Sequence, residues 1–258
     1  MDKPEEVVAN KKHWERMVKE RCGYTIPWLD LDVNIIRKYS RGELDNAPDK
    51  ISVITPKSIL TDMEGKDVLC LAAGGGQQSA VFGSLGANVT VVDIAQGQLD
   101  ADQKAAKHYG YKIKTIQGDM QDLSCLDDDS FDLVYGTAIC YVSDIQKVYS
   151  EVSRVLRRDG LFRVDFGQPA IHFIKWDGEG YQIYKPYCES LDLREDGAIE
   201  FRHYMDDIFN RLIEVGLTII EVEDLSRNRK PDKEFPPGSW NHENSYVGGS
   251  FVIISQKT

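Results

Sequence analysis

The segment 68–79 has the sequence VLCLAAGGGQQS and decides how the rest of the chain is interpreted. Its first residues are apolar and predict a buried strand, its glycines predict a tight turn, and the residues after them predict a helix. Glycine has no Cβ, so such a turn can bring a nucleotide-like ligand against the main chain. A second apolar run, 89–93, ends in Asp93. A strand, a glycine turn, a helix and a second strand with an acid about 20 residues on are typical of a unit that binds a ribose.

The pattern continues along the chain as alternating strands and helices. Strands at 67–72, 89–93, 113–117, 131–136 and 160–166 are expected, with helices near 77–85, 96–109 and 144–156. This alternation predicts an α/β fold with a mostly parallel, doubly wound sheet covered on both faces. The carboxyl ends of the strands then meet at one edge of the sheet, where ligands bind in such folds.

We interpret the chain as one domain with additions. Residues 1–60 have helical spacing and predict a cap, and residues 61–167 form the cofactor-binding core. The segment 168–203 is rich in aromatic residues, glycine and charge, and we expect it to be a substrate lid, because connections of this length usually have a function. Residues 204–258 add a helix at 206–215 and strands at 217–224 and 246–256.

Composition and charge narrow the range of partners. The net charge of −11 argues against a nucleic-acid partner, because nucleic acids bind basic surfaces. The five cysteines are far apart and form no C-x-x-C pair, so they indicate no metal site and fit a reducing compartment. The N-terminus is charged, and no apolar run has the length of a membrane span. We therefore expect a cytoplasmic protein without a membrane partner; the sequence does not indicate its oligomeric state.

The glycine turn favours some ligands over others. Gly74 and Gly76 match two positions of the dinucleotide fingerprint, but Ser79 stands at the third, and no phosphate-binding lysine of a P-loop follows. A zwitterionic ligand fits better, because the backbone amides from Gly75 to Gln78 lie at a predicted helix N-terminus and could hold a carboxylate.

Polar or small residues also follow the other predicted strands. Asp93 can accept hydrogen bonds from both hydroxyls of a ribose, Asp119 can accept from an exocyclic amine, and Met120 can lie against a flat base. Each residue also has a structural interpretation. Asp93 could be a helix N-cap, Asp119 the cap of a turn, Met120 a core residue and Gln98 a solvated helix residue. The run 127–129, three aspartates, is interpreted as a solvated turn before the fourth strand.

Five motifs together resemble a known family. The sequences VLCLAAGGGQQ, VTVVDIAQGQLD, IKTIQGDMQDL, FDLVYGTAICYVSD and VYSEVSRVLRRDGLFRVDF resemble, in this order, the motifs of class I S-adenosylmethionine-dependent methyltransferases. The resemblance covers about residues 66–166. It implies a Rossmann-like, seven-stranded sheet with an antiparallel C-terminal strand, to which this chain adds its N-terminal cap and its lid after the fifth strand. It also implies S-adenosylmethionine as cofactor and S-adenosylhomocysteine as product.

The resemblance assigns residues to each part of the cofactor. They are Ala72, Ala73, Gly74 and Gly76 at the amino-acid end, Asp93 and Gln98 at the ribose, Ile94, Gly118, Asp119 and Met120 at the adenine, and Thr137 and Ala138 beneath the sulfonium. One position departs from the family pattern: Ala72 stands where an acidic residue is usual. A backbone carbonyl of Ala72 or Ala73 would therefore have to bind the cofactor's amino group.

Methyl transfer from a sulfonium is an in-line displacement, so the enzyme mainly aligns the nucleophile and excludes water. Where the acceptor must lose a proton, the candidate bases are His203, His172, Tyr184 and Asp165. Aromatic side chains from the cap and the lid are expected to wall an acceptor pocket; they are Tyr24, Trp28, Trp176, Tyr181, Tyr184, Tyr187 and Trp240.

The acceptor is expected to be a small molecule with an O, N or S nucleophile. The acidic charge favours this, and the residues after the fourth strand, 136–139, lack the Asn-Pro-Pro-Tyr motif of methyltransferases that act on nucleobases or glutamine amides. Two alternatives stay open: a non-catalytic S-adenosylmethionine-binding protein, and a Rossmann oxidoreductase that uses NAD(P).

Overall fold

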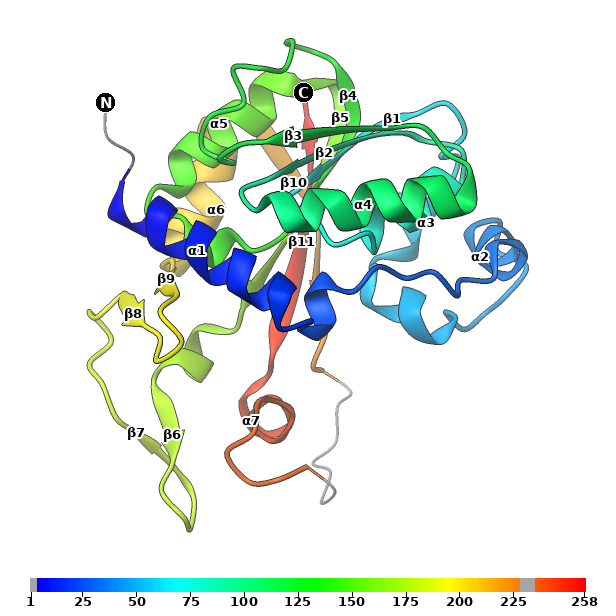
Figure 1. Cartoon of the computed structure of the whole chain (residues 1–258). Helices are drawn as coiled ribbons and strands as arrows, with labels where there is room; N and C mark the ends of the chain where they lie inside the picture. The colour runs from blue at the N-terminus through cyan, green and yellow to red at the C-terminus, as the bar shows by residue number, and fades with distance from the viewer. Residues whose placement is uncertain (1–3, 228–234) are drawn as a thin grey trace.

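A central sheet with the strand order β10-β11-β5-β4-β1-β2-β3 organises the fold (Figure 1). The computed structural model describes residues 4–227 and 235–258. The strands of this sheet are β1 (Asp67–Leu71), β2 (Asn88–Asp93), β3 (Ile113–Gln117), β4 (Phe131–Gly136), β5 (Leu156–Gly167), β10 (Leu217–Asp224) and β11 (Ser250–Lys257). Strand β11 pairs antiparallel with both β10 and β5, and β1 to β5 are parallel. The predicted seven-stranded, mostly parallel sheet with an antiparallel C-terminal strand is confirmed.

Helices cover both faces of the sheet, as the alternating pattern predicts. One face packs against α2 (Val33–Ser40), α3 (Gln78–Ser84) and α4 (Gln96–Tyr109), and the other packs against α5 (Ile145–Val155) and α6 (Met205–Glu214). Strand β1 shows why its sequence is apolar throughout. Val68 and Cys70 belong to the core on the α3 side, whereas Leu69 and Leu71 belong to the core on the α5 side.

The helix ends follow local sequence signals. Asp144 precedes α5 and accepts a hydrogen bond from the amide of Lys147 at 3.3 Å, as an N-cap does. Gly110 ends α4 in the left-handed conformation, with φ of 77°. These signals determine where each helix begins or ends, and therefore where the neighbouring strands begin and end.

The N-terminal segment, which we call the cap, contains short helices before β1. It consists of α1 (Glu5–Lys19), η1 (Gly23–Thr25), α2, η2 (Asp49–Val53) and η3 (Lys57–Leu60). Asn10 of α1 connects this cap to two distant parts of the chain. Its side chain exchanges two hydrogen bonds with the backbone of Ile199, at 2.8 and 2.9 Å, and donates a third to the carbonyl of Tyr141 at 3.2 Å.

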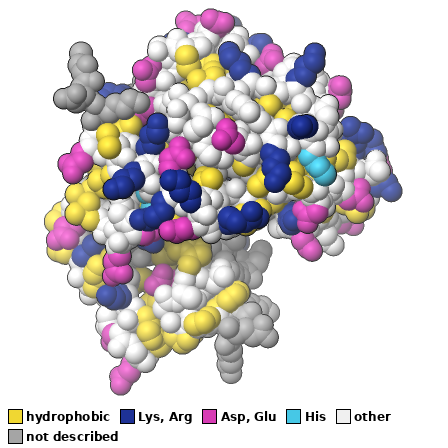
Figure 2. Space-filling view, in the orientation of Figure 1, with side chains coloured by type: hydrophobic (Ala, Val, Ile, Leu, Met, Phe, Trp, Pro, Cys, Tyr) yellow, Lys and Arg dark blue, Asp and Glu magenta, His cyan; other side chains and the backbone are white. Residues whose placement is uncertain are grey.

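The segment 168–203 contains more regular structure than the sequence predicted. It holds η5 (Pro169–His172) and two hairpins, β6 (Ile174–Trp176) with β7 (Tyr181–Ile183) and β8 (Leu191–Leu193) with β9 (Ile199–Phe201). Strands of three residues are too short to give a periodic pattern. Figure 2 shows hydrophobic side chains gathered over this lower part of the molecule, where Ile183, Leu191 and Leu193 are exposed.

The buried side chain of Arg202 connects the hairpin region to the residue that follows η5. Its guanidinium lies 4.3 to 4.5 Å from the ring centres of Phe173, Tyr187 and Tyr204, and it donates a hydrogen bond to the carbonyl of Tyr187. Such cation–π contacts with a buried arginine hold the hairpin region together without a large apolar core.

Three elements differ from the sequence prediction. A helix, α7 (Trp240–Val247), with Ser239 as its N-cap, replaces the predicted loop, so β11 begins at Ser250 rather than at residue 246. Helix α5 ends at Val155 and β5 begins at once, earlier than predicted. The short η4 (Ile139–Tyr141) follows β4. Within residues 4–227 and 235–258, no helix is both long and apolar enough to cross a membrane.

We predict that Asn10→Ala lowers the free energy of unfolding by about 1–3 kcal/mol, because three partly buried backbone groups lose their partner. Urea unfolding measures this change. Lys12→Ala, an exposed position on the same helix, is the control and should change stability by less than about 0.5 kcal/mol. Equal stability of the two variants would show that Asn10 does not join the cap to the rest of the chain.

Candidate active site

A cavity of about 1000 Å³ lies at the carboxyl edge of β1, β2, β3 and β4. The cap lines it with Val7, Trp14 and Trp28, and the C-terminal part of the chain lines it with Glu223 and Trp240. This volume is at the upper end of the range for ligand pockets, which run from about 300 to 1,000 Å³. The cavity therefore has room for a cofactor and a second small molecule.

The residues that the resemblance assigned to the cofactor line this cavity, with one exception. Those that line it are Ala72, Ala73, Gly74, Asp93, Ile94, Gln98, Gly118, Asp119, Met120, Thr137 and Ala138. The exception is Gly76. A Cβ at Gly76 would lie 2.6 Å from the carbonyl of Ala101 and 2.8 Å from Cβ of Pro27, so this glycine packs against α4 and the cap. Its role is to make room for the protein's own chain.

Asp93 lies at the centre of the site and connects two loops. Its Oδ2 accepts from the amide of Gly74 at 3.2 Å, and its Oδ1 accepts from the amide of Ala95, just before α4, at 2.9 Å. Burial raises the pKa of Asp93 to about 6, and these backbone amides oppose that rise. The N-cap of α4 is Ala95, so Asp93 is not the helix N-cap that its structural interpretation proposed; its carboxylate instead holds the loop just before α4, and the residue lines the cavity.

The amides of the glycine turn differ from the prediction. The amides of Gly75 and Gly76 donate to the carboxylate of Asp102, at 3.2 and 2.9 Å, and the hydroxyl of Ser79 donates to the same carboxylate. An internal carboxylate therefore holds two of the amides expected to bind a carboxylate of the ligand. Asp102 is fully buried in α4, and this burial raises its pKa to about 7.

The sequence analysis missed Asp102. Its position in a polar stretch of α4 resembles that of a solvated helix residue. The one available signal is that Asp102 lies three residues after Leu99, so it shares the buried face of the helix.

Ala72 and Thr137 join the ends of β1 and β4. The hydroxyl of Thr137 donates to the carbonyl of Ala72 at 2.6 Å, and the amide of Thr137 donates to the carbonyl of Leu71 at 3.1 Å. Ala72 has a φ of 50° and Ala138 a φ of 58°, both in the left-handed region that favours glycine. The chain therefore turns sharply after two strands that are neighbours in the sheet, at the wall of the cavity.

At the predicted adenine end, the structure shows the turn-capping role of Asp119. Its Oδ1 accepts from the amide of Gln121 at 2.9 Å, which caps a turn, and the residue also lines the cavity. Met120 likewise lines the cavity and packs against the core on the α5 side.

Two buried oxygen atoms show that the cavity suits a polar ligand. Oε1 of Gln98 and Oε1 of Gln78 are buried without a hydrogen-bond partner, and both residues line the cavity. Buried polar atoms nearly always have a partner, so a ligand with hydroxyl or amino groups would satisfy them. The absence of a Cβ at Gly74 matters here as well, because such an atom would lie 2.7 Å from Oδ2 of Asp93. These residues fit the ribose and amino-acid end of S-adenosylmethionine.

Three of the four candidate bases of the sequence analysis are not part of the cavity wall. His203 has its Nε2 3.1 Å from the carbonyl of Ile139, and burial lowers its pKa. His172 lies behind Gly167, and burial lowers its pKa to about 4, which makes its imidazole a weak base. Tyr184 is half exposed in the hairpin region. The geometry does not support a role as base for any of them.

Asp165 is the remaining candidate base, and it does line the cavity. It forms an ion pair with Arg163, which is almost fully buried and lies 4.4 Å from the ring centre of Tyr135. Arg163 also donates to the carbonyl of Thr55 at 3.1 Å. Its charge is therefore already balanced within the protein, and one face of Asp165 stays open to the cavity.

Of the aromatic residues predicted to line an acceptor pocket, only those from the cap and from α7 line the cavity. Tyr24, Trp28 and Trp240 line the cavity. The lid aromatics Trp176, Tyr181, Tyr184 and Tyr187 do not, and no residue of 168–203 does. Trp176 instead forms T-shaped contacts with Tyr181 and with His242 of α7, and the rings of Tyr181 and His242 are tilted against each other.

Acidic side chains outnumber basic ones in the cavity wall. Among the described residues that line it, the carboxylates are Asp93, Asp119, Asp165, Glu223 and Asp224, and the one Lys or Arg is Arg163. A wall of this kind favours cationic ligands and disfavours phosphates. In the part of the chain that the structure describes, no group of three or more His, Cys, Asp or Glu could hold a metal ion.

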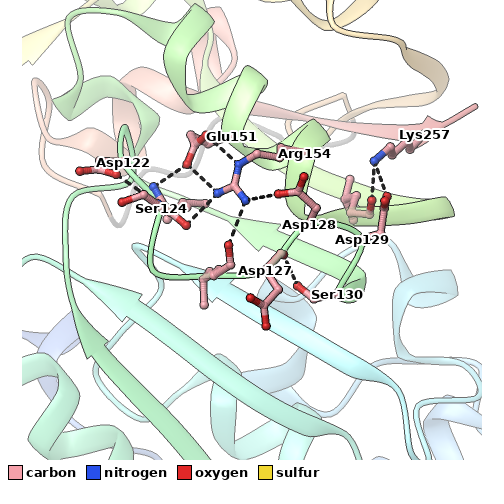
Figure 3. A network of polar contacts seen from close by, with 12 residues as sticks. Asp122, Ser124, Asp127, Asp128, Asp129, Ser130, Glu151, Arg154 and Lys257 are labelled. Atoms are coloured by element: carbon pink, nitrogen blue, oxygen red, sulfur yellow. Dashed lines mark hydrogen bonds and ion pairs between the residues drawn. The ribbon is translucent and has the colours of Figure 1, made fainter.

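A second polar network positions the loop that carries Asp119 and Met120 (Figure 3). Arg154 of α5 donates to the carbonyl of Leu123 at 2.8 Å, to that of Leu126 at 2.9 Å and to Asp128 at 2.6 Å. Glu151 binds Arg154 and accepts from the amide of Leu123 at 2.7 Å. The aspartate run 127–129 is therefore more than a solvated turn, since Asp129 also pairs with Lys257.

Comparison with known proteins agrees with this geometry. The model of a methyltransferase domain family matches residues 69–164. An uncharacterized methyltransferase, YbaJ, of Bacillus subtilis (strain 168) is 31% identical over 228 residues, which cover 83% of this chain and 88% of that protein.

Solved structures show the same fold. An S-adenosylmethionine-dependent methyltransferase from Mesorhizobium loti aligns with a TM-score of 0.65 at 20% identity, covering 81% of this chain and 96% of that one. Magnesium protoporphyrin IX methyltransferase from Synechocystis PCC 6803, solved with bound S-adenosylmethionine, aligns with a TM-score of 0.61 at 13% identity over 100% of both chains.

We predict that Arg154→Ala weakens the binding of S-adenosylhomocysteine about three- to tenfold, because the loop with Asp119 and Met120 loses hydrogen bonds worth about 1 kcal/mol each. Isothermal titration calorimetry measures the affinity. Arg158→Ala removes the same charge at an exposed position and is the control. If both variants bind like the wild type, the network does not position the adenine side of the site.

Proposed function

This chain belongs to the class I S-adenosylmethionine-dependent methyltransferases, and we propose that its acceptor is a small molecule with a neutral or cationic group around the reacting O, N or S atom. The observation that carries the proposal is the acidic cavity, which continues past the predicted cofactor residues to Asp165 and Glu223. The same cavity runs beneath α1, so the acceptor must be small enough to fit under the cap.

The cofactor part of the proposal rests on residues at the strand ends. Asp93 would accept from the ribose hydroxyls, Asp119 from the adenine amine, and Thr137 and Ala138 would lie nearest the reacting centre. When bound, S-adenosylmethionine supplies a methyl group that its sulfonium activates. The protein has to hold the acceptor behind that methyl group, and most of the gain in rate from such alignment is entropic.

The acceptor part of the proposal rests on a row of residues across the sheet. Asp165 of β5 and Glu223 of β10 both pair with Val252 of β11, so all three side chains share one face. The backbones of Asp165 and Glu223 therefore lie about 10 Å apart, on either side of a small apolar residue. The hydroxyl of Thr55 donates to Glu223 at 2.7 Å and fixes it.

This row suits an acceptor that becomes more positive as it reacts. A new bond forms between the nucleophile and the methyl carbon, the bond from that carbon to sulfur breaks, and positive charge passes to the acceptor. Carboxylates close to this charge stabilise it in a site that excludes water. Where the nucleophile carries a proton, Asp165 is placed to accept it.

The two alternatives are less well supported. A non-catalytic binding protein would fill the space beyond the cofactor with its own side chains, whereas here the cavity stays open as far as Trp240. A dinucleotide would bring a pyrophosphate to a wall of carboxylates, with amides of the glycine turn already bound to Asp102.

We predict that the purified chain transfers labelled methyl groups to members of a panel of small amines, phenols and thiols, and not to phosphorylated or polycarboxylate compounds. Asp165→Asn should lower kcat at least about tenfold where the nucleophile loses a proton, which is the lower range for a general base. It should leave the affinity for S-adenosylhomocysteine within about twofold, because Asp165 is not among the cofactor residues.

Asp159→Asn, an exposed change on the same strand, is the control and should keep full activity. Turnover of protein or nucleic acid without turnover of any small molecule would contradict the proposal. Full activity of Asp165→Asn would remove Asp165 from the mechanism.

A further inference from the structure

The backbone N–H groups of the glycine turn all point in one direction. Three consecutive amides, those of Gly74, Gly75 and Gly76, donate to carboxylates of the protein, the first to Asp93 and the other two to Asp102. The amide of Gly75 also lies 3.3 Å from the carbonyl of Gln98 in α4. The donors of the turn therefore all point toward the end of β2 and toward α4.

The carbonyl oxygens of the turn must then point the other way. These peptide bonds are trans, and in a trans peptide the carbonyl and the following N–H point in opposite directions. The carbonyl of Gly74 is thus directed away from Asp102, and that of Ala73 away from Oδ2 of Asp93. Both residues line the cavity, whereas Gly75 and Gly76 do not.

Other parts of the chain pack closely against the turn. A Cβ at Gly75 would lie 2.5 Å from the carbonyl of Tyr24, and one at Gly76 would lie 2.6 Å from that of Ala101. The cap closes on the turn from one side, where the amide of Trp28 donates to the carbonyl of Gly76 at 3.1 Å. Helix α4 closes on it from the other side, with Asp102 fully buried between them.

We propose that Asp102 is a positioning residue for the amino-acid end of the cofactor. By holding the amide of Gly75 against α4, its carboxylate turns the carbonyl of Gly74 away from that helix and toward the cavity. That carbonyl then lies beside the carbonyl of Ala73, which Asp93 orients through the amide of Gly74. The turn then presents acceptors to the cofactor's ammonium group.

Asp102→Asn tests the proposal, because it keeps the size of the side chain but sets an NH₂ group against one of the amides. The readout is the affinity for two ligands, measured by calorimetry. S-adenosylhomocysteine carries the ammonium group, and 5′-methylthioadenosine has the same adenosine and sulfur without the amino-acid end. We expect the affinity for the first to fall at least tenfold and that for the second to change less than threefold.

Asp100→Asn, an exposed change in the same helix, is the control and should leave both affinities unchanged. Should Asp102→Asn fail to fold, Ser79→Ala provides the same comparison. It removes one hydrogen bond to Asp102, so the loss for S-adenosylhomocysteine should be smaller but still confined to that ligand. Equal losses for both ligands, or no loss for either, would overturn the proposal.

Discussion

The site depends on the binding of three backbone amides of the glycine turn by two buried carboxylates. Asp93 and Asp102 are both almost without exposure, and burial raises the pKa of each toward neutrality. Burying two carboxylates costs free energy, and hydrogen bonds from the backbone amides and the Ser79 hydroxyl offset that cost. The glycine run is thus needed mainly for the close approach of α4 and the cap, and only at Gly74 for the cavity wall.

The rest of the site follows from this arrangement. With the turn fixed against α4, the ends of β1, β2, β3 and β4 form one side of the cavity, and the cap forms another. The Arg154 network holds the β3 end in the same way from the opposite face of the sheet. Because Arg163 is balanced by Asp165, the remaining carboxylates leave the cavity acidic, which agrees with a cofactor that carries a sulfonium.

Local patterns in the sequence were enough to predict the alternation of strands and helices, and the family resemblance assigned the expected cofactor residues. Most of these residues closely follow a strand, and the carboxyl ends of parallel strands meet at one edge. Of the candidate bases, Asp165 lines the cavity, whereas His172 and His203 do not, because whether they reach it depends on how 168–203 folds. Asp102 and α7 were missed for a related reason. Their sequences are polar, and the sequence alone does not show which groups pack against them.

A crystal structure of the protein with S-adenosylhomocysteine tests the central claim most directly. The account predicts the sulfur beside Thr137 and Ala138, the ammonium group against the carbonyls of Ala73 and Gly74, and the amides of Gly75 and Gly76 still bound to Asp102. A cofactor carboxylate bound to the amides of Gly75 and Gly76 in place of Asp102 would contradict it.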